Sequence, residues 1–169
     1  MHPSRFPCLL PSRQGLTPRG HCKKIGVSEQ AGHVVYWDAS AILSVLIQDA
    51  HSEQATEAAR RPVTHLISTL AYAEVIAVIA RLQRERELPT VLADSARQLV
   101  RMGPWRRLAL QPDWARIDEL ATQWPLRGAD LWHLAVASTL RRELPELRMI
   151  TFDSRLAAAT ASMGFAFPN

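Results

Sequence analysis

Lysine is almost absent from this chain of 169 residues: Lys23 and Lys24 are the only two. A phosphate-binding P-loop needs a lysine on the nucleotide phosphates, and Schiff-base catalysis needs an amine nucleophile. Glycine is also sparse after position 32, where only Gly103, Gly128 and Gly164 occur, so no Gly-rich phosphate loop is present. A Gly-x-Ser-x-Gly nucleophile motif is missing as well. These absences remove several common enzyme chemistries from consideration.

Cysteines and long apolar runs are equally scarce. Cys8 and Cys22 are the only cysteines, and both lie outside the region with regular hydrophobic patterning. A disulfide framework is therefore not expected, and a reducing cytoplasm is the default location. The sequence has neither an apolar stretch of membrane-spanning length nor the apolar segment of a secretory signal. With 47% hydrophobic residues, the composition suits one globular domain and no membrane partner.

Residues 1–32 differ from the remainder of the chain. They are rich in Pro, Arg, Gly and Ser and show no periodicity, which predicts a disordered leader; a start codon placed too early is the alternative. This segment has five basic residues and one acidic residue, so it accounts for the whole net charge of +4. The domain expected at 33–169 is neutral, not a general nucleic-acid surface. No compact zinc motif fits the spacing of the nearby Cys8, His21, Cys22 and His33.

From Val34 onward, short apolar segments alternate with segments of helical periodicity. Strands are expected at 34–37, 65–68, 107–110, 147–152 and 165–167. Helices are expected at 39–49, 52–61, 69–87, 89–102, 113–124, 128–144 and 154–163, with Thr69 as the N-cap of the third. This alternation predicts an α/β fold: a three-layer α/β/α sandwich with a mostly parallel central sheet.

Four acids lie in or beside these apolar segments: Asp38, Glu74, Asp130 and Asp153. Asp38 and Asp153 are expected as the last residues of strands and Asp130 in the first turn of a helix, which brings all three to the carboxyl edge of the sheet. Glu74 has only apolar neighbours at helical spacing and no cation to pair with. Because buried unpaired carboxylates are unfavourable, a cation is expected among them. Oxygen-only ligands favour Mg²⁺ or Mn²⁺ and suit phosphodiester hydrolysis.

Each acid also has a simpler interpretation. Asp38 and Asp153 are acceptable N-caps for the helices that follow them. Asp130 is placed to complement a helix dipole. The convergence of four acids in one fold favours the metal site over separate structural roles.

Four further residues are candidates for supporting roles. Ser40 is placed to hydrogen-bond a metal-bound water, or is an ordinary first-turn serine. His133 shares the helix face of Asp130 and is a ligand or a satisfied helix histidine. Arg127 and Arg155 are candidate phosphate contacts, with solvated arginines as the alternative.

Taken together, these segments resemble the four motifs of PIN-domain ribonucleases, and most closely those of VapC-type toxins. The resemblance covers about 34–169 and rests on Asp38-Ala39-Ser40, on 68–75 with Glu74, on 128–137 with Asp130, and on Thr151-Phe152-Asp153. It implies a Mg²⁺-dependent endoribonuclease, usually a homodimer, that acts as the toxin of a type II toxin–antitoxin system and is occluded by a small cognate antitoxin. It also implies that the acidic quartet is catalytic and that Ser40 fills the small hydroxyl position. The leader and the bulky Trp132 beside Asp130 depart from the pattern.

Other functions remain open at this stage. A housekeeping RNA-processing nuclease of the same family would use the same residues. A PIN-like binding protein without catalysis is a second alternative, against which the intact quartet argues. A phospho-acceptor receiver domain also gathers acids at the carboxyl edge of its sheet, but it needs a lysine that this domain lacks.

Overall fold

A parallel four-stranded sheet forms the centre of the structure, a computed structural model that describes residues 34–168. The predicted leader at 1–32 lies outside the described residues. In the order β3-β2-β1-β4 the sheet joins β1 (Val34–Trp37), β2 (Thr64–Ser68), β3 (Trp105–Leu108) and β4 (Arg148–Ile150), and all three pairings are parallel. The α/β sandwich predicted from the alternating pattern is confirmed, and the described sheet is wholly parallel.

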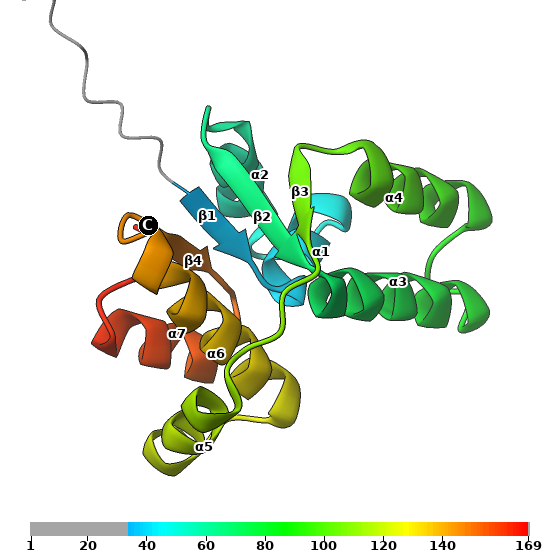
Figure 1. The fold of residues 1–169 in the computed structure, drawn as a ribbon. Helices are drawn as coiled ribbons and strands as arrows, with labels where there is room; N and C mark the ends of the chain where they lie inside the picture. The colour runs from blue at the N-terminus through cyan, green and yellow to red at the C-terminus, as the bar shows by residue number, and fades with distance from the viewer. Residues whose placement is uncertain (1–33, 169) are drawn as a thin grey trace, which may run out of the picture.

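Helices cover both faces of this sheet (Figure 1). One layer contains α1 (Ala39–Leu46), α2 (Ser52–Arg60), α3 (Thr69–Arg84) and α4 (Thr90–Met102). The other contains α5 (Trp114–Gln123), α6 (Gly128–Glu143) and α7 (Ser154–Ser162). Among the described residues, no helix has the length and apolar character needed to cross a bilayer.

The central strand β1 is buried on both faces, as a strand between two helical layers must be. Alternate side chains enter two separate cores. Val34 and Tyr36 face the layer of α5–α7 and share a core with Leu120, Leu134, Leu156 and Phe165. Val35 and Trp37 face the opposite layer and share a core with Ile42, Ile67, Val75 and Ile79. These two cores fix the height at which β1 ends and therefore where Asp38 emerges.

Strand β1 is also the switch point of the topology, because its neighbours are β2 on one side and β4 on the other. The chain leaves β3 at one edge, passes through α5 and α6, and returns as β4 at the opposite edge (Figure 1). In open parallel sheets, ligands bind at such a point, outside the carboxyl ends of the strands. The fold thus specifies the position of a site before any side chain is considered.

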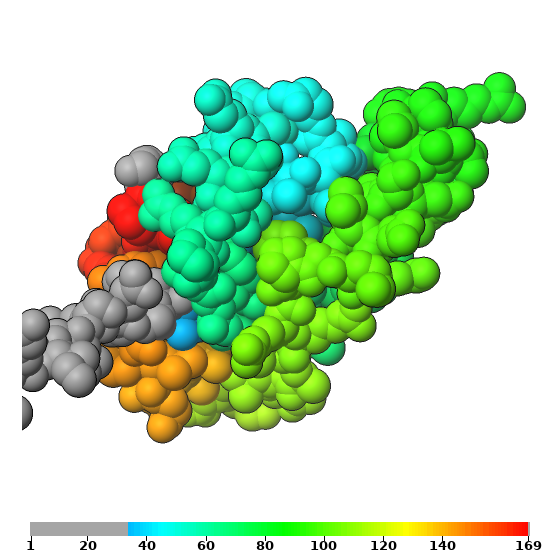
Figure 2. Space-filling model, turned by 90° about the horizontal axis from the view of Figure 1, so that it is seen from above, coloured from blue at the N-terminus to red at the C-terminus, as the bar shows by residue number. Residues whose placement is uncertain are grey.

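Helices α3 and α4 form a hairpin that extends away from the rest of the molecule, the green arm in Figures 1 and 2. The outer side of α4 exposes a set of large apolar side chains, Val91, Leu92, Leu99 and Met102.

Several predicted boundaries are wrong by one or a few residues. The N-cap of α3 is Ser68, not Thr69: Ser68 has extended backbone angles and its Oγ accepts the Ala71 N–H at 3.1 Å. Strand β3 begins at Trp105, two residues before the predicted start, because its pairing with β2 begins there. Asp38 and Asp153 follow β1 and β4 instead of ending them.

The predicted last strand at 165–167 is a single bridge between Met149 and Ala166. Gly164, at φ 72°, turns the chain sharply after α7, a left-handed conformation that favours glycine. Phe165 then enters the core and only one residue remains in register with β4. Burial of the phenyl ring, and not strand pairing, accounts for the apolar character of this segment.

Candidate active site

Asp38 occupies the switch point of the sheet. It follows β1 directly, caps α1 by accepting the Ala41 N–H at 2.9 Å, and is only 3% exposed. The capping interpretation is therefore geometrically correct, but it accounts for one of several contacts. An N-cap of a surface helix needs no such burial, so a second role is compatible with the geometry.

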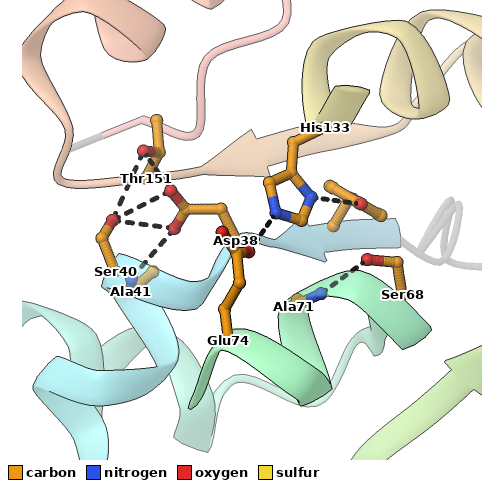
Figure 3. A network of polar contacts seen from close by, with 9 residues as sticks. Asp38, Ser40, Ala41, Ser68, Ala71, Glu74, His133 and Thr151 are labelled. Carbon is orange, nitrogen blue, oxygen red and sulfur yellow. Dashed lines mark hydrogen bonds and ion pairs between the residues drawn. The ribbon is translucent and has the colours of Figure 1, made fainter. Parts of the chain in front are cut away.

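Two hydroxyl groups hold the Asp38 carboxylate. Ser40 donates to it at 2.8 and 3.0 Å, and Thr151 donates to its second oxygen at 2.7 Å. The same hydroxyls accept backbone N–H groups from the loop after β4: Ser40 Oγ from Phe152 at 2.8 Å, and Thr151 Oγ1 from Asp153 at 3.1 Å. Ser40 and Thr151 thus join the ends of β1 and β4 through side chains (Figure 3).

Ser40 and Thr151 modify the sequence-based expectations in different ways. Ser40 is at the site, but its hydroxyl is used by Asp38 and Phe152 and not directed at a free ligand position. Thr151 was not predicted as a site residue. Its only signal in the sequence is its place two residues before Asp153, near the end of the strand predicted at 147–152.

Glu74 has a partner that sequence spacing did not reveal. His133 Nε2 lies 2.7 Å from Glu74 Oε2, and His133 Nδ1 lies 2.9 Å from the Tyr36 hydroxyl. Because a carboxylate only accepts hydrogen bonds, Nε2 donates to Glu74, which leaves Nδ1 for the contact with the Tyr36 hydroxyl. His133 is 2% exposed while the Glu74 side chain is 31% exposed, so this series of hydrogen bonds leads from the core to the open site (Figure 3).

The pKa values of Asp38 and Asp130 are both raised, by burial and, for Asp130, by neighbouring negative charges. Burial raises the pKa of Asp38 above its ordinary value, against the hydrogen bonds from Ala41, Thr151 and Ser40 and the nearby His133. Burial also raises the pKa of Asp130, and the negative charges of Asp153 and Glu74 add to the increase. Asp130 therefore lies in the electrostatic field of two other acids.

The remaining predicted residues lie at the rim. Asp153 caps α7 by accepting the N–H groups of Arg155 and Leu156, both at 2.9 Å. Arg127 precedes α6, and its charge slightly offsets the raised pKa of Asp130. The side chains of Arg127 and Arg155 are exposed and form no ion pair with any residue in 34–168. Both are free to contact a ligand at this edge.

The chemistry of these side chains suits a hard divalent cation, since the charges of Asp153 and Glu74 act on Asp130 and Asp38 lies at the same edge of the sheet. Across residues 34–168, however, no three Asp, Glu, His or Cys side chains are already close enough to hold a metal ion. Glu74 is directed to His133, and Asp153 to two backbone N–H groups. Closing around an ion thus requires side-chain rotation at these positions.

The raised pKa values predict an unusual pH dependence of stability. With Asp38 and Asp130 shifted upward, the folded state binds protons more tightly than the unfolded chain does. The free energy of unfolding therefore falls as pH rises from the ordinary carboxyl pKa, about 3.9, through the raised values. Exposed carboxylates with lowered pKa, Asp49 and Glu119, act in the opposite sense with less weight.

Metal-free protein should accordingly melt at a higher temperature in mildly acidic than in neutral buffer, and saturating Mg²⁺ should reduce that difference. Differential scanning fluorimetry across pH, with EDTA or Mg²⁺, measures both curves. A melting temperature that rises steadily toward neutral pH in EDTA would show that the acids do not repel one another in the folded state.

Comparison with known proteins connects this geometry to a family. The sequence model of the PIN domain matches residues 35–161. VapC20 of Mycobacterium tuberculosis, described as a Sarcin-Ricin loop cleaving toxin, shares the fold with a TM-score of 0.51 and 18% identity; the match covers 78% of this chain and 96% of that one. PAE2754 from Pyrobaculum aerophilum shares it with a TM-score of 0.53 and 20% identity, covering 82% and 90%. No curated protein sequence matches this chain.

Proposed function

Because the chain belongs to the PIN domain family, we propose that it is a Mg²⁺-dependent endoribonuclease and the toxin of a type II toxin–antitoxin pair. The family consists of nucleases. The observation that carries the proposal is the buried Asp38 carboxylate at the switch point of the sheet, at an edge where the charges of Asp153 and Glu74 also act on Asp130. Mutual repulsion of this kind is unfavourable for a scaffold but favourable for binding a cation.

In this proposal Asp38, Glu74, Asp130 and Asp153 hold the cation, for which Mn²⁺ is an acceptable substitute. The chemistry supplied by such an ion is activation of water near neutral pH and neutralisation of charge on the phosphodiester. The protein contributes orientation: Ser40 and Thr151 fix the Asp38 carboxylate, and His133 fixes that of Glu74. Preorganised carboxylates need less rearrangement when substrate arrives.

The arginines at the rim supply the attraction for RNA that the neutral domain otherwise lacks. Arg127 precedes α6, Arg155 lies in the first turn of α7, and both side chains are exposed. Guanidinium groups bind phosphates in a bidentate manner, so each is suited to one phosphate beside the cleaved bond. We therefore assign them to substrate backbone contacts.

The toxin role is supported by the shared fold with VapC20, which its description gives as a toxin that cleaves the Sarcin-Ricin loop. A toxin must be inhibited in its own cytoplasm, and the partner expected is a small antitoxin that covers the acidic site. A homodimer is expected from the family resemblance. A housekeeping RNA-processing nuclease would use the same site without such an inhibitor. Co-expression with the product of an adjacent small gene distinguishes the two, because only a toxin should be inhibited by that product.

Purified protein should cleave single-stranded RNA in Mg²⁺ or Mn²⁺ and lose that activity in EDTA. Mg²⁺ should also raise the melting temperature, because an ion that binds only the folded state stabilises it by mass action, about 2.7 kcal/mol at a hundred times its Kd. Gel-resolved cleavage of a labelled RNA and thermal melts on the same sample measure the two effects. Full cleavage in EDTA would contradict the proposal, and Ca²⁺ or Na⁺ at equal ionic strength controls for salt.

A further inference from the structure

A small groove at the carboxyl edge of the sheet is lined by two tryptophans. Its cavity volume is about 380 Å³. The lining includes Gln111 from the connection between β3 and α5, Trp114 at the start of α5, Trp132 of α6 and Thr69 at the start of α3. The lining is mostly apolar, with polar groups at Thr69 and Gln111.

This groove lies at the same edge of the sheet as the proposed active site, because Thr69 follows β2 and Ala109 follows β3. The Trp132 ring meets the His133 ring edge to face, with centroids 5.6 Å apart at 88°. His133 in turn contacts Glu74 at 2.7 Å. Thr69 directly follows β2 and opens the helix that carries Glu74. The groove and the acids therefore lie at the same carboxyl edge of the sheet, and Trp132 and His133 connect them through ring contact.

Trp114 has an exposure that the fold does not require. It is 80% exposed at the first position of α5, although tryptophan is the side chain with most to gain from burial. The side chains of Gln111 and Thr69 form no hydrogen bond with another residue of the described range, so their donors and acceptors face solvent. The lining thus combines stacking surface with unused hydrogen-bonding groups.

We propose that this groove binds an unpaired nucleobase of the RNA, next to the phosphate that is cleaved. The inference rests on the proposed nuclease function and deepens it. Every base has a π-face, so Trp114 and Trp132 provide a stacking site, and the size is at the lower end of small-molecule pockets. Gln111 and Thr69 then contact the edge of the base and favour some bases over others.

RNA suits this groove better than a protein partner does. A docked helix needs an extended apolar strip, such as the exposed side of α4. The groove is instead short, and it lies at the edge of the sheet where a substrate must reach the acids. Its lining contains no charged side chain, which suits a base and not a phosphate.

The test compares Trp114→Ala and Trp114→Phe with Met102→Ala, a control at an equally exposed apolar residue on the α4 arm. Trp114→Ala should raise KM for single-stranded RNA roughly tenfold with little change in kcat, and weaken binding of the same labelled RNA in EDTA by a similar factor. Trp114→Phe should recover part of the loss, and the control should match wild type. The dependence of binding on salt should be unchanged, because no phosphate contact is lost.

The result that overturns the inference is a Trp114→Ala protein with wild-type KM and wild-type RNA binding. A variant that weakens binding of a protein partner but not of RNA would overturn it equally. Wild-type protein that binds RNA without cleaving it would contradict the nuclease function, and the binding comparison would still decide the role of the groove. Wild-type protein that neither cleaves nor binds RNA would remove both proposals.

Discussion

Asp130→Asn should lower RNA cleavage in Mg²⁺ by at least about a hundredfold, while the metal-free protein melts at the same or a higher temperature. Burial and the charges of Asp153 and Glu74 raise the pKa of Asp130, so its ionised form is disfavoured in the folded state. No hydrogen bond in the described structure depends on its carboxylate. Asparagine keeps the shape and removes the charge. Activity and stability should therefore change in opposite directions.

The helix-dipole interpretation of Asp130 predicts the reverse on both counts. A first-turn acid that only complements α6 would cost about 0.3–1 kcal/mol on neutralisation, with cleavage unaffected. Asp118→Asn, at an exposed acid on α5, is the matched control and should leave both quantities unchanged. Melting curves in EDTA and cleavage rates in Mg²⁺, measured on one preparation, decide between the two. A destabilised, fully active Asp130→Asn protein would show that Asp130 only complements the dipole of α6 and does not belong to the cation site.

His133→Leu should destabilise the protein by about 2 kcal/mol and also reduce cleavage. The substitution removes the imidazole partner of the buried Tyr36 hydroxyl, which keeps its contact with Ser68, and frees Glu74 from the bond that orients it. The lost hydrogen bond of this buried hydroxyl accounts for most of the expected loss of stability. The loss of activity has a separate cause, since Glu74 then samples several orientations.

A double-mutant cycle separates these causes. Tyr36→Phe added to His133→Leu should restore part of the stability, because the buried hydroxyl that lost its imidazole partner is gone, but none of the activity. Tyr36→Phe alone keeps the contact between His133 and Glu74 and should retain most of the cleavage. Urea denaturation provides the free energies of unfolding. Additive effects of the two substitutions on stability would show that the hydroxyl and the imidazole are not coupled.

The architecture was predictable because the local pattern and the global fold agree. Alternating apolar segments predicted each described strand to within a few residues, and the predicted helices are all present. The carboxyl edge also followed, because the chain enters a helix directly after β1 and shortly after β4. Asp38, Asp130 and Asp153 could therefore be assigned to one edge from the sequence.

What could not be predicted depends on how separate elements cross. Periodicity shows that Glu74 lies on an apolar face of its helix, but not which residue of another element reaches its carboxylate. His133 is 59 positions away, on a helix of the opposite layer, and the two side chains meet only because both helices pass the switch point of the sheet. For the same reason Glu74 is less buried than its apolar neighbours in the sequence predicted. The hydroxyl contacts of Thr151 with Asp38 were inaccessible in the same way, at a separation of 113.

The pairing of β4 with β1 has a consequence for the nascent chain during translation. Asp38 leaves the ribosome before the strand that pairs beside it and the Thr151 hydroxyl that holds it have been made, because Thr151 lies 113 positions further along the chain. A nascent chain that stops short of β4 therefore contains three of the acids without the geometry that joins them. Polysomes carrying unfinished chains, and products of late nonsense mutations, should be harmless to the RNA around them.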